Sequence, residues 1–287
     1  MLTLHANGLD FACLEQGSGP LVLLLHGFPD TAHTWSHQMS ALAAAGYRVV
    51  APFLRGYHPT SIPADGYYDK ATLASDVAAL IDALGGGEPA YLVGQDWGAI
   101  VSYAVLAAFP HKVRRAVVMA VPHPAVVARS MLNPRHVHRS FHWWFFQLAD
   151  LPERALLDND MAFIDYLWSY WTAPGHEDKA HIDDIKTMLR RPGVLTATLG
   201  YYRAMLEGGR ADPTLADIRQ RMNGPITVPT LALCGSEDLR AELMTDQAAH
   251  FSGEYRYEEI AGAGHFLHRE KPAEVTRRVL EWLRGPG

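Results

Sequence analysis

The stretch Tyr91-Leu92-Val93-Gly94-Gln95-Asp96-Trp97-Gly98-Ala99-Ile100 places one acidic residue between two glycines, with an apolar run on either side. The first run predicts a buried strand and the second predicts a helix. Gly94 and Gly98 have the spacing of a sharp strand-to-helix turn that presents a nucleophile, usually serine, at the end of a sheet. A carboxylate needs no deprotonation before it attacks, so Asp96 indicates displacement at a saturated carbon through an alkyl ester. Capping of the helix is the other interpretation of Asp96.

A histidine and an acid that would complete a catalytic triad follow late in the chain. His265 comes after a glycine-rich loop, and its late position fits the order nucleophile, acid, histidine. The buried strand predicted before residue 236 runs into a turn that ends in Glu237 and Asp238. We expect His265 to act as the base and Asp238 to hold its tautomer, with Glu237 as the alternative.

Near the start of the chain, a buried apolar strand runs into His26-Gly27-Phe28-Pro29-Asp30. The glycine and the proline turn the chain over the nucleophile, where such a turn presents backbone N–H groups. We expect the amides of Phe28 and Trp97 to form an oxyanion hole for the charge that develops when water attacks the ester of Asp96.

These motifs together resemble the α/β-hydrolase family, in its branch of epoxide hydrolases and dehalogenases. The resemblance runs over nearly all 287 residues and implies an α/β fold with a mostly parallel eight-stranded sheet, flanking helices and an inserted helical cap. Continuous Val, Leu and Ala runs between helical patterns support such a sheet independently. The matching motifs are His26-Gly27-Phe28-Pro29, Arg55-Gly56-Tyr57, Gln95-Asp96-Trp97-Gly98, Asp238 and Gly264-His265-Phe266.

The cap is expected after the sixth strand, where alternating strands give way to an aromatic-rich helical pattern. We expect the cap at residues 134–216 and the core at residues 1–133 and 217–287. Most of the rings in the cap are expected to pack on the core, while some, such as Trp143 and Tyr201, line an apolar substrate pocket above Asp96 together with Asp30 of the core.

Epoxide hydrolases usually carry two cap tyrosines whose hydroxyls hold and protonate the epoxide oxygen. The resemblance assigns the later position to Tyr202, and the adjacent Tyr201 is less favoured because helical neighbours point about 100° apart. The earlier position holds His142, so a histidine and a tyrosine would be the ring-opening donors. In the same branch a glutamate commonly stands near the hydrolytic water, and this chain has Asp30 at that position. Helix capping is an equal alternative for Asp30.

The sequence therefore predicts an epoxide hydrolase that forms vicinal diols through an aspartyl ester, which His265-activated water hydrolyses. A dehalogenase with the same triad is the alternative, since His142, Trp143 and Tyr202 resemble the halide pocket of fluoroacetate dehalogenases. A haloalkane is the favoured substrate of that alternative, with Trp97 and Trp143 as candidate halide donors. Haloacids are less favoured as substrates, because Trp97 stands where one of two carboxylate-clamping arginines would be needed. A third alternative is a non-catalytic binding protein on the same fold.

The composition of the chain limits its partners. With 25 Lys and Arg against 31 Asp and Glu, the formal net charge is −6, and no basic cluster suggests binding of nucleic acid. No run reaches transmembrane length and no signal segment is recognised, so a cytoplasmic protein without membrane contact is expected. Cys13 and Cys234 are expected as buried thiols. We expect no metal or other cofactor, with a small epoxide and water as the only partners, and the sequence leaves monomer and homodimer open.

Overall fold

An eight-stranded sheet runs through the part of the chain that the computed structural model describes, residues 1–206 and 209–285. Its strands lie in the order β1-β2-β4-β3-β5-β6-β7-β8. β2 pairs antiparallel with β1 and with β4, and all later pairs are parallel. The prediction of a mostly parallel eight-stranded sheet is confirmed. The strands are β1 (Leu2–Ala6), β2 (Leu9–Gln16), β3 (Leu21–Leu25), β4 (Arg48–Pro52), β5 (Ala90–Gln95), β6 (Val113–Met119), β7 (Thr230–Gly235) and β8 (Tyr255–Ile260).

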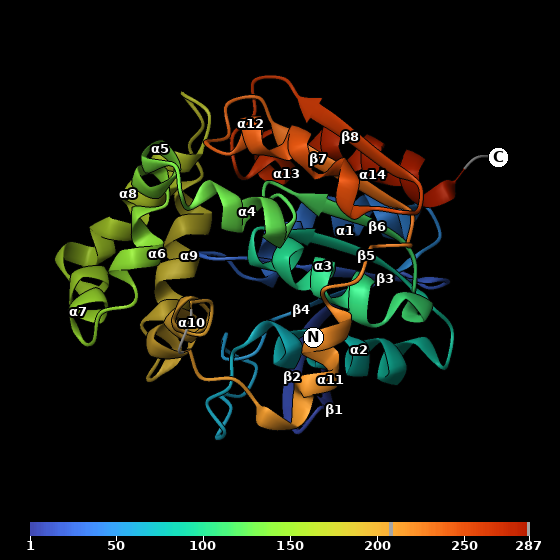
Figure 1. Ribbon diagram of the computed structural model, residues 1–287, viewed down its shortest axis with the longest axis horizontal. Coiled ribbons are helices and arrows are strands. Elements are labelled where there is room, and N and C mark those ends of the chain that lie inside the picture. The colour runs from blue at the N-terminus through green and yellow to red at the C-terminus, as the bar shows by residue number, and fades with distance from the viewer. Residues whose placement is uncertain (207–208, 286–287) are drawn as a thin grey trace.

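Helices cover both faces of this sheet. α2, α3 and α11 lie on one face, and α1 and α14 lie on the other (Figure 1). Because both faces are covered, every residue of β3 and of β7 is buried, as their continuous apolar runs predict. The core helices are α1 (Ser36–Ala44), α2 (Lys70–Gly85), α3 (Trp97–Ala108), α4 (Pro124–Ser130), α11 (Ala216–Arg221), α12 (Ala241–Met244), α13 (Leu267–Glu270) and α14 (Pro272–Arg284), with 3₁₀ turns η1 (Ala32–Trp35), η2 (Pro110–Lys112) and η5 (Thr245–His250). The 3₁₀ turn η4 (Pro213–Leu215) falls within the residues expected for the cap.

The carboxyl ends of the parallel strands bring four loops to one edge of the sheet. The loops after β3, β5, β7 and β8 carry Phe28, Asp96, Asp238 and His265 respectively. Register explains why the first two meet, because Leu25 at the end of β3 pairs with Gly94 of β5. Residues far apart in the sequence thus share one site, at the sheet edge where α/β proteins usually bind their ligands.

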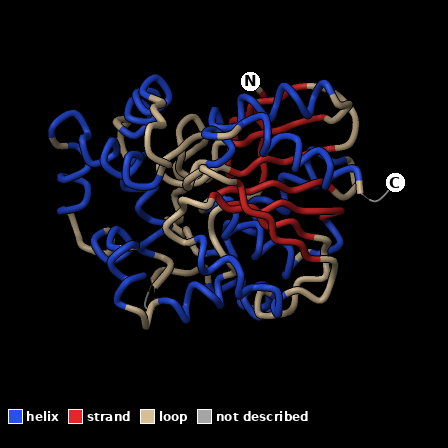
Figure 2. The backbone as a smooth tube through the Cα atoms, turned by 90° about the horizontal axis from the view of Figure 1, so that it is seen from above, coloured by secondary structure: helices blue, strands red, loops and turns tan. Residues whose placement is uncertain are grey.

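A second group of helices lies between β6 and β7 and gathers beyond one end of the sheet (Figure 1, Figure 2). We propose residues 134–216 as the extent of this cap, since α11, which begins at Ala216, already packs against α2 and α3. The cap helices are α5 (Pro134–Arg139), α6 (Phe141–Phe145), α7 (Leu151–Leu157), α8 (Ala162–Trp171), α9 (Lys179–Leu189) and α10 (Val194–Arg203), with the 3₁₀ turn η3 (Asn159–Met161).

Trp168 of α8 ties the cap to the core. Its indole N–H donates to the carbonyl of Pro29 at 3.0 Å, and its ring stacks on Phe266 with the centroids 3.6 Å apart. Such an aromatic pair contributes about 0.5–1.5 kcal/mol beyond its buried area. One cap side chain therefore holds both the loop of Phe28 and the loop of His265.

Among the described residues, no helix has both the length and the apolar character that crossing a membrane requires. Cys13 and Cys234 are buried free thiols, as expected.

Candidate active site

Asp96 stands at the turn between β5 and α3, in a strained backbone conformation. Its φ is 52° and its ψ is −117°, a region that residues with a side chain rarely adopt and that clusters at functional sites. The flanking glycines are needed because a Cβ on Gly94 would overlap the Gly98 carbonyl, and a Cβ on Gly98 would overlap the Leu25 carbonyl. The Asp96 carboxylate makes no capping hydrogen bond to α3. The capping interpretation of Asp96 is therefore wrong, and its side chain is available for chemistry.

The loop after β3 presents a backbone donor to this carboxylate. The N–H of Phe28 donates to Asp96 Oδ1 at 2.8 Å, and the peptide bond between Phe28 and Pro29 is cis. Trp97 is the first residue of α3, so its N–H has no partner within the helix. His26 anchors the loop, since its Nε2 accepts from the N–H of Leu54 at 3.1 Å. The two predicted oxyanion residues thus flank Asp96 from two elements.

His265 and Asp238 meet Asp96 on the opposite oxygen. His265 Nδ1–H donates to Asp238 Oδ2 at 2.7 Å, and His265 Nε2 lies 3.3 Å from Asp96 Oδ2. Asp238 is buried, whereas its neighbour Glu237 is exposed and contacts Ser236. The structure therefore brings Asp238, and not Glu237, to the histidine.

The charges of this trio favour a protonated His265. Burial by itself would lower the pKa of the imidazole, but the charge and hydrogen bond of Asp238, together with those of Asp96, raise it to about 9. His265 is 2 % exposed and Asp96 is 7 % exposed, so little water screens these charges. The resting site consequently holds an imidazolium between two carboxylates.

Three residues that the sequence did not point to hold the loop of His265. Glu270 accepts from the N–H groups of Gly264 and Phe266 at 2.8 and 3.0 Å. Gln95 donates from its amide to the His265 carbonyl at 3.1 Å, and the Trp171 carbonyl accepts from the His265 N–H at 2.8 Å. The only signal for Glu270 is an acid five residues after the histidine, and Trp171 carried no signal beyond its aromatic character.

Tyr202 and His142 face the same site from the cap. The Tyr202 ring lies 5.4 Å from the ring of Phe28, 5.3 Å from that of Trp97 and 5.6 Å from that of His142, measured between centroids. Burial lowers the pKa of His142 well below its usual value, with smaller contributions from the charges of Arg240 and His265. His142 is therefore a neutral imidazole, which can donate from one ring nitrogen only.

Tyr201 has a different environment from its neighbour. Its hydroxyl donates to the carbonyl of Arg55 at 2.8 Å, in a buried setting. Burial raises the pKa of both hydroxyls well above the usual value, and the charge of Asp96 adds to this at Tyr202, so that both hydroxyls keep their protons. Of the two tyrosines, only Tyr202 packs beside His142.

Trp143 lies beside a buried cation. The guanidinium of Arg240 sits over the Trp143 ring, 5.2 Å from its centroid, and donates to Ser140 Oγ at 3.3 Å. The backbone N–H of Arg240 donates to Asp238 Oδ1 at 2.7 Å. Arg240 thus connects the loop of the triad acid to the helix that carries His142 and Trp143, a link that the sequence did not predict.

Asp30 contacts the cap and caps no helix. Thr31 is the residue that caps η1, so the capping alternative for Asp30 is wrong. Asp30 Oδ1 instead accepts from the N–H of Thr31 and from His181 Nε2, both at 2.7 Å. Although burial alone would raise the pKa of Asp30, the charge and hydrogen bond of His181 lower it to about 2. Asp30 lies in the loop of Phe28, and its partner His181 belongs to α9.

An aspartate at a strand-to-helix elbow, with a histidine and a second aspartate at the same sheet edge, defines the architecture of an α/β hydrolase. The chain belongs to the alpha/beta hydrolase fold family, which matches residues 20–272. The resemblance to its epoxide hydrolase branch is confirmed by the relatives that follow.

Two curated relatives cover almost the whole chain. Epoxide hydrolase A of Mycobacterium tuberculosis is 34 % identical over 97 % of this chain and 95 % of its own length. An AB hydrolase superfamily protein of Bacillus subtilis is 32 % identical over 98 % of this chain and 96 % of its own. Among solved structures, Epoxide Hydrolase A from Mycobacterium thermoresistibile matches with a TM-score of 0.81 and 28 % identity, over 99 % of this chain and 98 % of that one.

Proposed function

We propose that this chain is an epoxide hydrolase in which Asp96 forms a covalent ester with the substrate. The observation that carries the proposal is the carboxylate of Asp96, held at a strained elbow with one oxygen on the Phe28 N–H and the other facing His265. The names of the relatives support the same substrate class.

In the first step, Asp96 attacks an epoxide carbon and the carbon–oxygen bond of the ring breaks. The ring oxygen takes a proton from the hydroxyl of Tyr202, while a ring N–H of His142 donates a hydrogen bond to it. Both donors are neutral and buried, so in this low-dielectric setting their dipoles stabilise the developing alkoxide strongly. The product of the step is a hydroxyalkyl ester on Asp96.

In the second step, water attacks the ester carbonyl carbon. Because the ester carries no charge at Asp96, the pKa of His265 falls and the imidazolium releases its proton to bulk water. The neutral His265 then takes one proton from the attacking water, and the amides of Phe28 and Trp97 hold the oxyanion. When the intermediate collapses, the proton on His265 passes to the departing diol oxygen. The remaining proton of the water passes through the Asp96 carboxyl to the Tyr202 tyrosinate. His265, again beside a charged Asp96, regains a proton from bulk water, so that the starting enzyme is restored.

A dehalogenase would use the same three residues, with His142 and Tyr202 around a halide. The relatives named epoxide hydrolase favour the first function. Fluoroacetate and a haloalkane are nevertheless included in the test, because halide release would reassign the two donors.

The test is incubation of the purified protein with styrene oxide, 1,2-epoxyhexane, 1-bromobutane and fluoroacetate, with diol and halide measured in the same samples. We expect diol alone, and none from Asp96→Ala. His265→Gln should trap the ester as a mass increase, equal to the mass of the epoxide, on the peptide that contains Asp96. Asp238→Asn should slow hydrolysis far more than its matched control Glu237→Gln. Full turnover by Asp96→Ala would eliminate the covalent scheme.

A further inference from the structure

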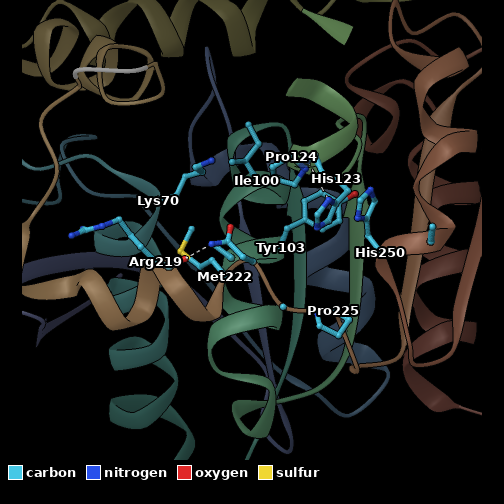
Figure 3. Close-up of a pocket in the computed structure, with 14 residues that line it drawn as sticks. Lys70, Ile100, Tyr103, His123, Pro124, Arg219, Met222, Pro225 and His250 are labelled. Carbon is cyan, nitrogen blue, oxygen red and sulfur yellow. Dashed lines mark hydrogen bonds between the residues drawn. The ribbon is translucent and has the colours of Figure 1, made fainter. Parts of the chain in front are cut away.

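A pocket with a volume of about 780 Å³ lies among α2, α3, α4, α11 and η5 (Figure 3). None of the described residues that line it belongs to the triad or to the ring-opening pair. One wall is the segment 123–125, where the chain leaves the sheet toward the cap, and another is the segment 222–225, which follows the return from the cap. Its volume is within the range of about 300–1,000 Å³ that is usual for small-molecule sites.

The charge of the pocket is opposite to that of the whole chain. The chain has a formal net charge of −6, yet the described lining includes Lys70, Arg219 and two histidines, and no carboxylate. The rest of the lining is mostly apolar, with Ile100 and Met222 as its large aliphatic side chains. A cationic, mostly apolar pocket matches a ligand with an anionic head and a hydrocarbon body.

Within the described part of the chain, Lys70 is a pocket cation that has no carboxylate partner. Its side chain extends toward Ile100 in Figure 3, and burial lowers its pKa, with the charge of Asp69 opposing this. Among residues 1–206 and 209–285, no carboxylate oxygen lies within 4.0 Å of its ammonium group. A partly buried ammonium without a counter-ion is unfavourable, and an anion in the pocket would remove that cost.

Unlike Lys70, Arg219 already has hydrogen-bonding and charged partners within the protein. Its guanidinium donates to the Asp212 carbonyl at 2.6 Å and lies 3.8 Å from Asp69 Oδ1. Figure 3 shows it turned away from the two histidines. The first amides of α2 are engaged as well, since Asp69 accepts from the N–H groups of Ala71 and Thr72. The pocket therefore lacks the several free donors that a phosphate needs.

Two stacked histidines form the opposite wall. The rings of His123 and His250 lie 4.2 Å apart, nearly parallel. His123 Nδ1 accepts from the N–H of Ala125 at 3.2 Å, which puts the proton of the neutral ring on Nε2. Burial, the charge of His250 and the charge of Lys70 lower the pKa of His123 to about 4. His250 Nε2 is buried and has no hydrogen-bond partner within the described chain. At neutral pH this wall thus offers N–H groups and no negative charge.

We propose that this pocket is a second binding site, which takes an amphipathic monocarboxylate of medium chain length. The carboxylate lies at the Lys70 ammonium, the alkyl chain lies along Ile100 and Met222, and the stacked histidines form the wall opposite Lys70. This binding is independent of the epoxide chemistry, because it uses none of the residues of the triad.

The proposal is tested by calorimetric titration of the full-length protein with octanoate. Replacing a charged hydrogen-bonding partner usually lowers affinity by about 10- to 100-fold, and we expect Lys70→Met to raise the Kd of octanoate by that factor. Lys179→Met is the matched control, because Lys179 is exposed and paired with Asp183 on α9. Its Kd should equal that of the original chain. Octan-1-ol and inorganic phosphate should bind far more weakly than octanoate.

Octanoate could also bind to the apolar walls of the active site. A second variant distinguishes binding in this pocket from binding in the active site. Ala249 is exposed and lines the pocket, so Ala249→Trp fills it without disturbing the core. We expect this variant to lose octanoate binding and to keep diol formation. Octanoate binding that is unchanged in both Lys70→Met and Ala249→Trp, or that is absent from the original chain, would overturn the proposal.

Discussion

Replacing Asp96 by Asn should lower the pKa of His265. The substitution keeps the shape of the side chain and removes a negative charge 3.3 Å from His265 Nε2. In the original chain the imidazole has a pKa of about 9, because its charge is stabilised on both sides. In the variant only Asp238 remains, at 2.7 Å from Nδ1.

The size of the change follows from the contact that is lost. A hydrogen bond to a charged group contributes about 1.5–3 kcal/mol, and one pKa unit corresponds to about 1.36 kcal/mol. Loss of the Asp96 charge should therefore lower the pKa of His265 by roughly 1–2 units. The contribution of Asp238 is the larger of the two, so Asp238→Asn should lower the pKa further than Asp96→Asn does.

The assay is NMR titration of protein labelled in its histidine rings, with the His265 signal assigned by its loss in His265→Gln. Esterification of Asp96 by substrate removes the same charge as the Asn substitution does. The titration therefore also measures whether ester formation moves His265 toward the neutral form that accepts a proton from water. An unchanged pKa in Asp96→Asn would refute the electrostatic coupling, and with it this link between the two steps.

Three further predictions concern the tyrosine pair, the buried Asp30 and the elbow. Tyr202→Phe should slow ester formation by about 10²–10⁴-fold in rapid-mixing experiments. Tyr201→Phe should chiefly lower the unfolding free energy, by about 1 kcal/mol. Equal effects of the two substitutions on ester formation would contradict the assignment of Tyr202 as the proton donor. The folded pKa of Asp30, about 2, is below its usual 3.8, so its charge stabilises the fold above pH 3.8 and this contribution is lost as the pH falls toward 2. Above pH 5, urea unfolding should accordingly show Asp30→Asn less stable than the original chain by roughly 2 kcal/mol of unfolding free energy, and this difference should shrink in acid. A difference in unfolding free energy that does not depend on pH would count against the ion pair. Gly98→Ala should lose at least about 1–3 kcal/mol of unfolding free energy because its Cβ meets a backbone carbonyl. The control Gly85→Ala should lose none, because its Cβ would make only ordinary contacts at 3.9 Å. Unchanged stability of Gly98→Ala would refute the predicted overlap.

The core half of the site was predictable because its residues follow strands. A buried parallel strand reads as an apolar run, and the turn after it carries glycine and a functional side chain, so Asp96, His265 and an acid at position 237 or 238 could be assigned from local pattern and order. The choice between Asp238 and Glu237 needed coordinates. Adjacent residues in a turn differ in direction, and only the structure shows that Glu237 is exposed.

The cap contacts could not be predicted in the same way, since each joins side chains that no local pattern relates. His181 meets Asp30 across 151 positions of the chain, and Arg240 meets Ser140 across 100. The hydrophobic periodicity of a cap helix shows which of its faces is buried. It does not show which core residues that face contacts. The sequence pattern therefore gave no signal for His181, and the capping alternative left open for Asp30 was wrong because the neighbouring Thr31 caps η1.

The contrast has a physical basis in how each half of the site is held. The triad rests on backbone geometry, namely a positive φ at Asp96 and glycines that fit no side chain, and such constraints appear directly in the sequence. The pair that we propose for ring opening lies in the cap, which is held to the core by cation–π and aromatic contacts such as Arg240 over Trp143 and Trp168 on Phe266. Many residue combinations satisfy contacts of that kind. Substitutions in the cap contacts should therefore alter which epoxide is accepted while the chemistry at Asp96 persists, whereas substitutions at the elbow glycines should remove both.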